Sequence, residues 1–265
     1  MYSSLQSAFK YLGYYLTADN GKGHGIHSPF IYEFITKVLN DKAGSPQFAA
    51  LEKLRGKLKK DKTVITVEDL GAGSGRTEKR SVTSIANRSL KPKKFGQLFY
   101  RIIKQYDLKI ILELGTSLGV TTCYLSMANP SARVITMEGA KEIAAIAKQN
   151  FNTLELKNIE LMEGHFDSTL RDALSNIDRV DFAFIDGNHR REPTERYFRE
   201  IISKAHNGSI VVLDDIHWSR EMEVAWKNII ANNLVTCSID LYFIGIVFFR
   251  QEFKDKQHFR IRFCP

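Results

Sequence analysis

The sequence has few cysteines and no long run of apolar residues. Its 3 cysteines, Cys123, Cys237 and Cys264, are widely separated and form no CxxC pair. A disulfide framework or a cysteine zinc site is therefore not expected, and a reducing compartment, the cytoplasm, is predicted. No stretch approaches the roughly 18 apolar residues of a membrane-spanning helix. The N-terminal segment also lacks the basic region and apolar run of a secretory signal.

Proline and glycine are uncommon as well, with 6 and 17 among 265 residues, so collagenous and low-complexity chains are excluded. Apolar residues make up 43% of the chain and charged residues 26%, which is typical of a globular protein. The length suffices for one sizeable core with a smaller accessory region. We expect a mainly helical N-terminal cap region over residues 1–94 and a larger domain over residues 95–265.

Positive charge is concentrated in one segment. The chain has a net charge of +8, and residues 53–104 hold 15 Lys and Arg against 4 Asp and Glu. An anionic partner, such as nucleic acid or a phosphorylated substrate, is one interpretation. A solvated basic surface is the favoured interpretation, because few aromatic residues accompany these charges and the segment has no nucleic-acid-binding motif.

The pattern of apolar residues predicts helices first and then alternating strands and helices. In residues 2–18 apolar residues recur at helical spacing, and Ser28 before Pro29 is typical of a helix N-terminus. From residue 109 onward, apolar runs alternate with helical segments, which indicates parallel strands with helices on both faces. The expected strands are residues 109–115, 132–138, 158–164, 179–186, 208–215, 234–241 and 244–250. The last two are joined too closely for a parallel crossover, so they should form an antiparallel hairpin.

A glycine-containing turn follows the first expected strand. It comprises Glu113, Gly115, Thr116, Ser117 and Gly119. Glycines in such a turn let the backbone approach a ligand closely, and the helix that begins there presents N–H donors. The next strand ends at Glu138, whose carboxylate can accept hydrogen bonds from both hydroxyls of a ribose. The two features together predict a nucleoside-binding site.

The third expected strand is followed by Gly164, His165, Phe166 and Asp167. Gly164 permits a close approach of the backbone, and the rings of His165 and Phe166 can flank an adenine. Asp167 is either the N-cap of the next helix or a ligand contact.

Acidic residues and histidines follow the fourth and fifth strands, in the sequences Asp186-Gly-Asn-His189 and Asp214-Asp215-Ile-His217. The carboxyl ends of parallel strands share one edge of a sheet, so these side chains should converge. Asp186, Asp214 and Asp215 are candidate ligands of a hard divalent cation such as Mg²⁺. His189 is a candidate general base, with Asp186 beside it, although capping and mutual hydrogen bonding would also account for the cluster.

A second glycine-rich segment, DLGAGSG at residues 69–75, has a composition closer to that of a cofactor loop. A polar, basic stretch follows it, and no second strand ends in an acid. We therefore interpret it as a mobile loop near the active site rather than as the main cofactor turn.

In their order along the chain, ELGTSLG, the strand-final Glu138, EGHFD, FIDGNH and VVLDDIHW resemble the class I S-adenosylmethionine-dependent methyltransferases. Within that class, residues 95–250 are similar to small-molecule O-methyltransferases of the catechol, caffeoyl-CoA and sugar types. The resemblance implies an α/β, Rossmann-like, doubly wound seven-stranded sheet of order 3-2-1-4-5-7-6 with the last strand antiparallel.

The resemblance also implies roles for individual residues. Around the methionine moiety it places Glu113, Gly115, Thr116, Ser117 and Gly119. Glu138 would bind the ribose, and Gly164, His165 and Phe166 would lie at the adenine. Asp186, Asp214 and Asp215 match metal-ligand positions, and His189 stands where catechol-type enzymes carry a catalytic lysine.

The implied function is S-adenosylmethionine-dependent O-methylation of a small hydroxylated molecule, with assistance from a divalent metal such as Mg²⁺. The alternatives are a nucleic-acid methyltransferase that uses the basic segment 53–104, a non-catalytic nucleotide-binding module, and an NAD-dependent oxidoreductase. The expected partner is a small-molecule acceptor rather than a membrane, and the sequence is compatible with a homo-oligomer.

Overall fold

The computed structural model describes residues 1–41, 46–68 and 77–263. By their contacts these residues form two compact units. The first contains residues 1–41 and 178–263, and the second contains residues 46–68 and 77–177. The expected division at residue 94 falls inside the second unit, and it stays a prediction.

Three βα repeats form the centre of the second unit. Strands β3 (Ile110–Leu114), β4 (Arg133–Glu138) and β5 (Ile159–Glu163) run parallel, with β4 in the middle. Each strand is followed by a helix, namely α6 (Val120–Ala128), α7 (Lys141–Thr153) and α8 (Phe166–Ser175). All three helices contact β4 or β5, and the carboxyl ends of β4 and β5 meet at the register pair Glu138 and Glu163.

The second unit also contains three further helices and a small two-stranded sheet. Its helices are α3 (Gln47–Leu58), α4 (Val82–Ser89) and α5 (Lys93–Tyr106), and its extra strands are β1 (Val64–Glu68) and β2 (Thr77–Ser81). β1 and β2 form an antiparallel two-stranded sheet. The polar, largely exposed sequence of β2 has no strand-like alternation, so the sequence did not predict it. The DLGAGSG segment, 69–75, lies outside the described residues.

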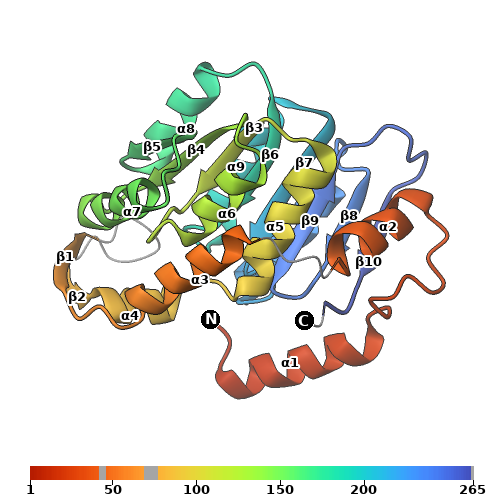
Figure 1. Cartoon of the computed structure of the whole chain (residues 1–265). Helices are drawn as coiled ribbons and strands as arrows, with labels where there is room; N and C mark the ends of the chain where they lie inside the picture. Colours follow the sequence, from red (N-terminus) through yellow and green to blue (C-terminus); the bar gives the residue numbers. More distant parts are fainter. Residues whose placement is uncertain (42–45, 69–76, 264–265) are drawn as a thin grey trace. The chain divides into compact units, whose positions relative to one another are not determined.

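The first unit contains a mixed group of strands. The order is β6 (Val180–Ile185), β7 (Ala205–Asp214), β9 (Ile244–Phe248), β8 (Cys237–Asp240) and β10 (Gln257–Arg260). β6 and β7 are parallel, β9 is antiparallel to both of its neighbours, and β10 is parallel to β8. Helices α9 (Arg191–Ile202) and α10 (Arg220–Ala231) follow β6 and β7. Figure 1 shows helices flanking the strands of each unit.

These strands confirm the α/β, Rossmann-like class. The seven predicted strands appear as the order 3-2-1 in the second unit and 4-5-7-6 in the first, and the predicted antiparallel hairpin is present as β8 and β9. Two details differ from the prediction. β10 adds a strand beside β8, and β1 with β2 forms a sheet of its own. β10 has the sequence QHFR, which is too short and too polar to indicate a strand.

The N-terminal helices of the first unit begin where the sequence predicts. α1 (Ser4–Thr17) has Ser3 and Gln6 as a capping box, and α2 (Pro29–Phe34) has Ser28 as its N-cap. A π-helical turn, η1 (Ile35–Leu39), continues α2. The apolar residues of α1 face solvent, however, and Tyr14 is the buried side chain of that helix. Within the described part of the chain, no helix combines the length and the apolar character needed to cross a bilayer.

Two helical glycines in the second unit give a test of this packing. A Cβ on Gly96 of α5 would lie 2.4 Å from the buried ring of Tyr124, whereas a Cβ on Gly56 of α3 would meet nothing within 4 Å. We predict that Gly96→Ala lowers the free energy of unfolding by about 1–3 kcal/mol, because the ring cannot move in a filled core. Gly56→Ala should raise it by up to about 1 kcal/mol through helix propensity. Urea unfolding of both variants checks this, and equal effects would contradict the packing of α5 on α6.

Candidate functional site

The turn after β3 has an unusual backbone conformation. Gly115, Ser117 and Gly119 all have positive φ, at 106°, 48° and 77°. The backbone N–H groups of Gly115 and Thr116 both donate to the carbonyl oxygen of Met137, over 3.1 and 3.0 Å. This fixes the turn to the end of β4. A Cβ on Gly119 would lie 2.5 Å from the ring of Phe151, so only glycine fits where α6 begins.

The carboxylate of Glu138 lies against this turn. Its Oε2 accepts a hydrogen bond from the backbone N–H of Ser117 over 2.8 Å, and its Oε1 accepts one from Ala140 over 2.9 Å. The side chain is half-buried, so solvent and ligands can reach it. A carboxylate has about four acceptor sites, and the backbone uses two of them here. These two backbone contacts hold the carboxylate in one orientation at the surface of the turn.

Glu113 and Thr116 lie in the interior rather than at the surface of the turn. Both are buried. The Oε2 of Glu113 accepts hydrogen bonds from the hydroxyls of Thr122 and Thr136 over 2.5 and 2.7 Å, and the hydroxyls of Thr116 and Thr136 are 2.6 Å apart. These side chains support the turn from behind. Burial, and then the negative charge of Glu113, raise the pKa of the neighbouring Cys123 thiol, so Cys123 is not a thiolate nucleophile.

A residue that the sequence did not indicate also reaches the turn. The hydroxyl of Ser89, at the end of α4, lies 2.8 Å from the hydroxyl of Ser117. Ser89 belongs to the N-terminal region that was expected to form a cap. A serine in a polar, basic stretch carries no pattern that would single it out.

The segment after β5 completes this side of the second unit. Gly164 has a φ of 137°, and its N–H donates to the carbonyl oxygen of Glu138 over 2.9 Å. His165, not Asp167, is the N-cap of α8, because its Nδ1 accepts from the backbone N–H of Asp167. His165 is exposed and Phe166 is half-buried. The turn, Glu138 and these residues therefore occupy the carboxyl ends of three adjacent parallel strands.

The acidic cluster lies in the first unit. Each of Asp186, His189 and Asp214 offers one possible ligand atom, and these atoms lie within 4.8 Å of one another. The Nε2 of His189 is 3.6 Å from the Oδ1 of Asp186, and its Nδ1 is 3.9 Å from the Oδ2 of Asp215. The ring of Trp218 lies 5.8 Å from that of His189. The predicted convergence is thus present within this unit.

Asp215 lies differently from the other two aspartates. It has a φ of 53°, and its backbone N–H donates to the carbonyl oxygen of Phe243 over 2.7 Å. The group that could hold a cation contains His189 in its place, whereas the sequence suggested Asp186, Asp214 and Asp215. The base and the metal ligands that the sequence treated separately therefore share one location.

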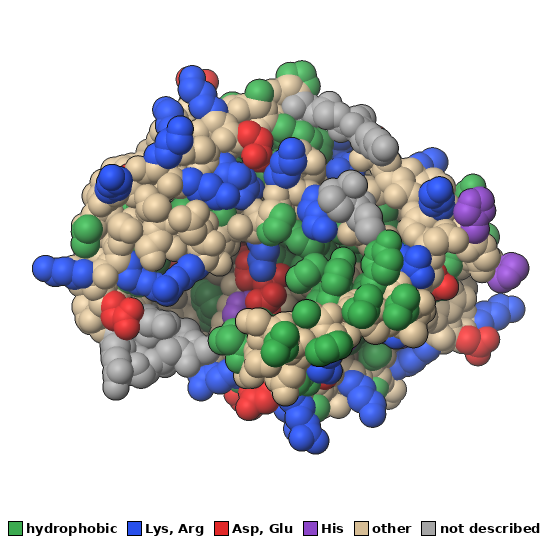
Figure 2. Space-filling view, turned by 90° about the horizontal axis from the view of Figure 1, so that it is seen from below, with side chains coloured by type: hydrophobic (Ala, Val, Ile, Leu, Met, Phe, Trp, Pro, Cys, Tyr) green, Lys and Arg blue, Asp and Glu red, His purple; other side chains and the backbone are tan. Residues whose placement is uncertain are grey.

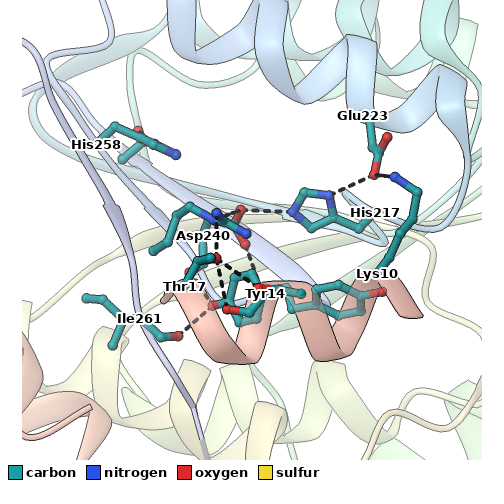
Figure 3. A network of polar contacts seen from close by, with 12 residues as sticks. Lys10, Tyr14, Thr17, His217, Glu223, Asp240, His258 and Ile261 are labelled. Carbon is teal, nitrogen blue, oxygen red and sulfur yellow. Dashed lines mark hydrogen bonds and ion pairs between the residues drawn. The ribbon is translucent and has the colours of Figure 1, made fainter. Parts of the chain in front are cut away.

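A polar network connects the loop after β7 to α1 (Figure 3). The Nε2 of His217 is 2.8 Å from the Oδ2 of Asp240, and its Nδ1 is 3.3 Å from the Oε1 of Glu223. Lys10 of α1 donates to the same Glu223 oxygen over 2.8 Å, and the hydroxyl of Tyr14 donates to the carbonyl oxygen of Asp240 over 2.8 Å. Among these residues, the sequence indicated only His217. Lys10 and Tyr14 lie 213 and 226 residues before their partners Glu223 and Asp240, so spacing carried no indication of these contacts.

The charge states of the side chains in this network follow from their burial and from the hydrogen bonds between them. Burial raises the pKa of the Tyr14 hydroxyl, which keeps it a hydrogen-bond donor. Burial opposes the ionisation of Glu223, but hydrogen bonds from Lys10 and Tyr2 outweigh it and lower the pKa of this carboxyl. The hydrogen bond to Glu223 in turn raises the pKa of Lys10. Both groups are therefore charged near neutral pH.

Comparison with known proteins agrees with this geometry. Residues 112–216 match a family model described as a methyltransferase domain. No curated protein matches the sequence. An O-methyltransferase from Bacillus cereus in complex with SAH shares 18% identity over 83% of this chain and 97% of its own, with a TM-score of 0.57.

Two further solved structures are similar. The SAH-bound methyltransferase PaMTH1 from Podospora anserina has 12% identity over 80% of this chain and 100% of its own, with a TM-score of 0.55. The O-methyltransferase TomG from Streptomyces achromogenes, in complex with SAM, has 18% identity over 61% and 82%, with a TM-score of 0.51. The resemblance to class I S-adenosylmethionine-dependent methyltransferases is thereby confirmed, and the chain has their fold.

The ion pair between Lys10 and Glu223 gives a test of how α1 is attached. We predict that Lys10→Met lowers the free energy of unfolding at pH 7 by about 0.5–1 kcal/mol, because the pair is only partly exposed to solvent. The pKa of Glu223 is lowered in the folded state, so its contribution is present above the unfolded value and is lost as the pH falls through the folded value. The difference between wild type and variant should therefore shrink on acidification.

Urea unfolding at a series of pH values measures this difference. Lys37→Met is the matched control, because Lys37 pairs with Glu33 on an exposed surface. Its effect should be close to zero at every pH. Equal losses in the two variants would show that Lys10 does not hold α1.

Proposed function

We propose that this chain is an S-adenosylmethionine-dependent methyltransferase that methylates an oxygen of a small hydroxylated molecule. The observation that carries the proposal is the carboxylate of Glu138, which backbone N–H groups orient beside a glycine turn with positive φ. The methyltransferase match over residues 112–216 supports methyl transfer. The solved O-methyltransferases with this fold support oxygen as the acceptor atom.

The residues of the second unit fit this cofactor. The carboxylate of Glu138 is oriented by backbone N–H groups, and a carboxylate can accept hydrogen bonds from two neighbouring hydroxyls of a ribose. Gly115 and Gly119 let the main chain come close to the amino-acid end of the ligand, while His165 and Phe166 offer ring surfaces for adenine. When bound, S-adenosylmethionine supplies an electrophilic methyl group on its sulfonium. The buried Glu113 and Thr116 act indirectly in this proposal, by holding the turn.

In the first unit, His189 is the candidate base for the acceptor hydroxyl. Carboxylates of Asp186 and Asp215 lie 3.6 and 3.9 Å from its two ring nitrogens, so they balance the positive charge of the ring once it has accepted a proton. Histidine serves well in this role at neutral pH. Removing the proton from the hydroxyl leaves an alkoxide or phenoxide, which is the stronger nucleophile toward a methyl group.

A divalent cation is the second device that this cluster allows. Asp186 and Asp214 offer carboxylate oxygens, which suit Mg²⁺, whereas the imidazole of His189 suits softer transition metals. We propose Mg²⁺ on the aspartates, with Asp215 contributing as the sequence suggested and His189 left as the base. Such an ion would lower the pKa of a bound hydroxyl.

We also propose the class of methyl acceptor and the cellular location of the protein. A small molecule is favoured over nucleic acid, because the basic segment supplies no base-reading motif. The cytoplasm is favoured because Cys123 and Cys237 are buried, free thiols.

Glu138→Ala tests the cofactor site. We predict that it weakens binding of S-adenosylhomocysteine by ten-fold or more, as measured by calorimetry, because the ribose hydroxyls lose their acceptor. Glu163→Ala is the matched control, since Glu163 ends the neighbouring strand in register with Glu138 but is exposed and paired with Lys148. Its affinity should equal that of wild type. Unchanged affinity in Glu138→Ala would rule out this residue as the ribose ligand.

A second set of variants tests the acidic cluster. His189→Ala should lower kcat by about 10²-fold or more while the affinity for S-adenosylhomocysteine is unchanged. A chelator should abolish methyl transfer, Mg²⁺ should restore it, and Asp186→Asn should behave like the chelated protein. These rates are measured with a panel of catechols and other hydroxylated aromatic molecules.

His206→Ala is the control for these variants. His206 also pairs with an aspartate, Asp181, over 2.8 Å, but at the opposite ends of β6 and β7. Its kcat should not change. Full activity of His189→Ala together with resistance to chelators would show that the cluster is only a hydrogen-bonded structural element.

A further inference from the structure

The outer face of α1 is apolar and exposed to solvent. Leu5, Phe9, Leu12 and Leu16 are 74%, 73%, 53% and 69% exposed. Ala8 and Gly13 flank these four residues, one on each side of the stripe. No charged or hydrogen-bonding side chain interrupts it. Figure 2 shows hydrophobic side chains gathered on the surface that carries α1.

The opposite face of α1 is fixed, so the helix cannot roll to bury these residues. Tyr14 is buried and donates to the carbonyl oxygens of Asp240 and Ile261, and Lys10 pairs with Glu223 (Figure 3). The hydroxyl of Tyr242 donates to the carbonyl oxygen of Ser7. The outer face is therefore held outward by contacts on three successive turns of the helix.

The spacing of the exposed residues fits a second helix. Leu5, Phe9, Leu12 and Leu16 are separated by four, three and four positions, which is the a/d spacing along which two helices pack. Scattered surface leucines need no explanation, but an uninterrupted seam of this kind on a fixed helix does.

Along the outer face of α1, the order of large and small residues is the same in both directions. When α1 is reversed about the midpoint between Lys10 and Tyr11, Leu5 falls opposite Leu16, Ala8 opposite Gly13, and Phe9 opposite Leu12. Leucine thus faces leucine at the ends and Phe9 faces Leu12 at the centre, while the small residues Ala8 and Gly13 lie at matching heights on the two flanks. Such a surface is self-complementary in an antiparallel pair with two-fold symmetry.

We propose that the outer face of α1 pairs antiparallel with α1 of a second copy of this chain. Gly13 supports the proposal, because it lies inside a helix at a cost of about 1 kcal/mol relative to alanine, and a Cβ there would meet nothing within 4 Å. Packing inside this chain gives no reason for the glycine. An approaching second helix does, since small residues on both flanks of the stripe, Ala8 and Gly13, let two backbones come close.

The size and charge of the face favour a second copy over a membrane. Side chains this exposed offer on the order of 100 Å² of apolar surface each, so two copies with their flanking residues cover about 1,000 Å², where specific interfaces begin. Membrane-surface helices have a polar face rich in Lys and Arg. α1 has one such residue, Lys10, and Glu223 neutralises it.

The oligomeric state of the full chain tests the proposal. Light scattering coupled to gel filtration, at micromolar concentration, should give twice the monomer mass for wild type. Phe9→Glu and Leu12→Glu should give the monomer mass, with an unchanged far-ultraviolet circular dichroism spectrum. Leu234→Glu is the control, because Leu234 is also exposed but lies between α10 and β8, and it should remain a dimer.

Cysteine pairs test the orientation. After oxidation, a mixture of Leu5→Cys and Leu16→Cys chains should form a cross-linked dimer, whereas neither variant alone should. Cross-linking of each variant alone would indicate a parallel pair and contradict the proposal. A monomeric wild type would also overturn it, as would binding to phosphatidylcholine–phosphatidylserine vesicles that Phe9→Glu abolishes in a monomeric protein.

Discussion

The hydrogen bonds from the backbone N–H groups of Ser117 and Ala140 to the carboxylate of Glu138 are the interaction on which the candidate cofactor site depends. They orient an acid that would otherwise rotate freely at a strand end. The same contact ties the turn after β3 to the end of β4, and Gly164 adds a bond to the backbone of Glu138. Three strand ends are thereby fixed around one carboxylate. Charged hydrogen bonds of this kind are roughly twice as strong as neutral ones.

The first unit brings several acidic side chains close together. Asp186, Asp214 and Asp215 lie close together, and like charges at short distance repel one another. His189 lies among these aspartates, in a position that suits either a general base or a metal ligand. The loop that carries Asp215 continues into His217, which Asp240 and Glu223 hold through its two ring nitrogens. The N-terminal helix thus contributes to the position of a loop far from it in the sequence.

The sequence predicted most of the strands, because buried parallel strands need continuous apolar runs such as Val180–Ile185. Their order was implied by the resemblance to the methyltransferases. The sequence also indicated Glu138 and His189, since the first ends a strand and the second lies in the loop after one. It did not predict β2 and β10, which are short and polar. The resemblance places Glu113 and Thr116 at the methionine moiety, and this stays a prediction for two residues that the structure shows to be buried. The sequence carried no sign of Lys10, Tyr14 or Asp240. Those features depend on contacts between distant segments, which periodicity does not contain.

The central claim is that the turn after β3 and the acid after β4 bind the nucleoside of S-adenosylmethionine. A crystal structure of the protein with S-adenosylhomocysteine tests it most directly. The account predicts that both ribose hydroxyls lie within hydrogen-bond distance of the Glu138 carboxylate, with the amino-acid end of the ligand against the turn from Gly115 to Gly119. A nucleoside bound elsewhere, with neither ribose hydroxyl in contact with the Glu138 carboxylate, would contradict the account.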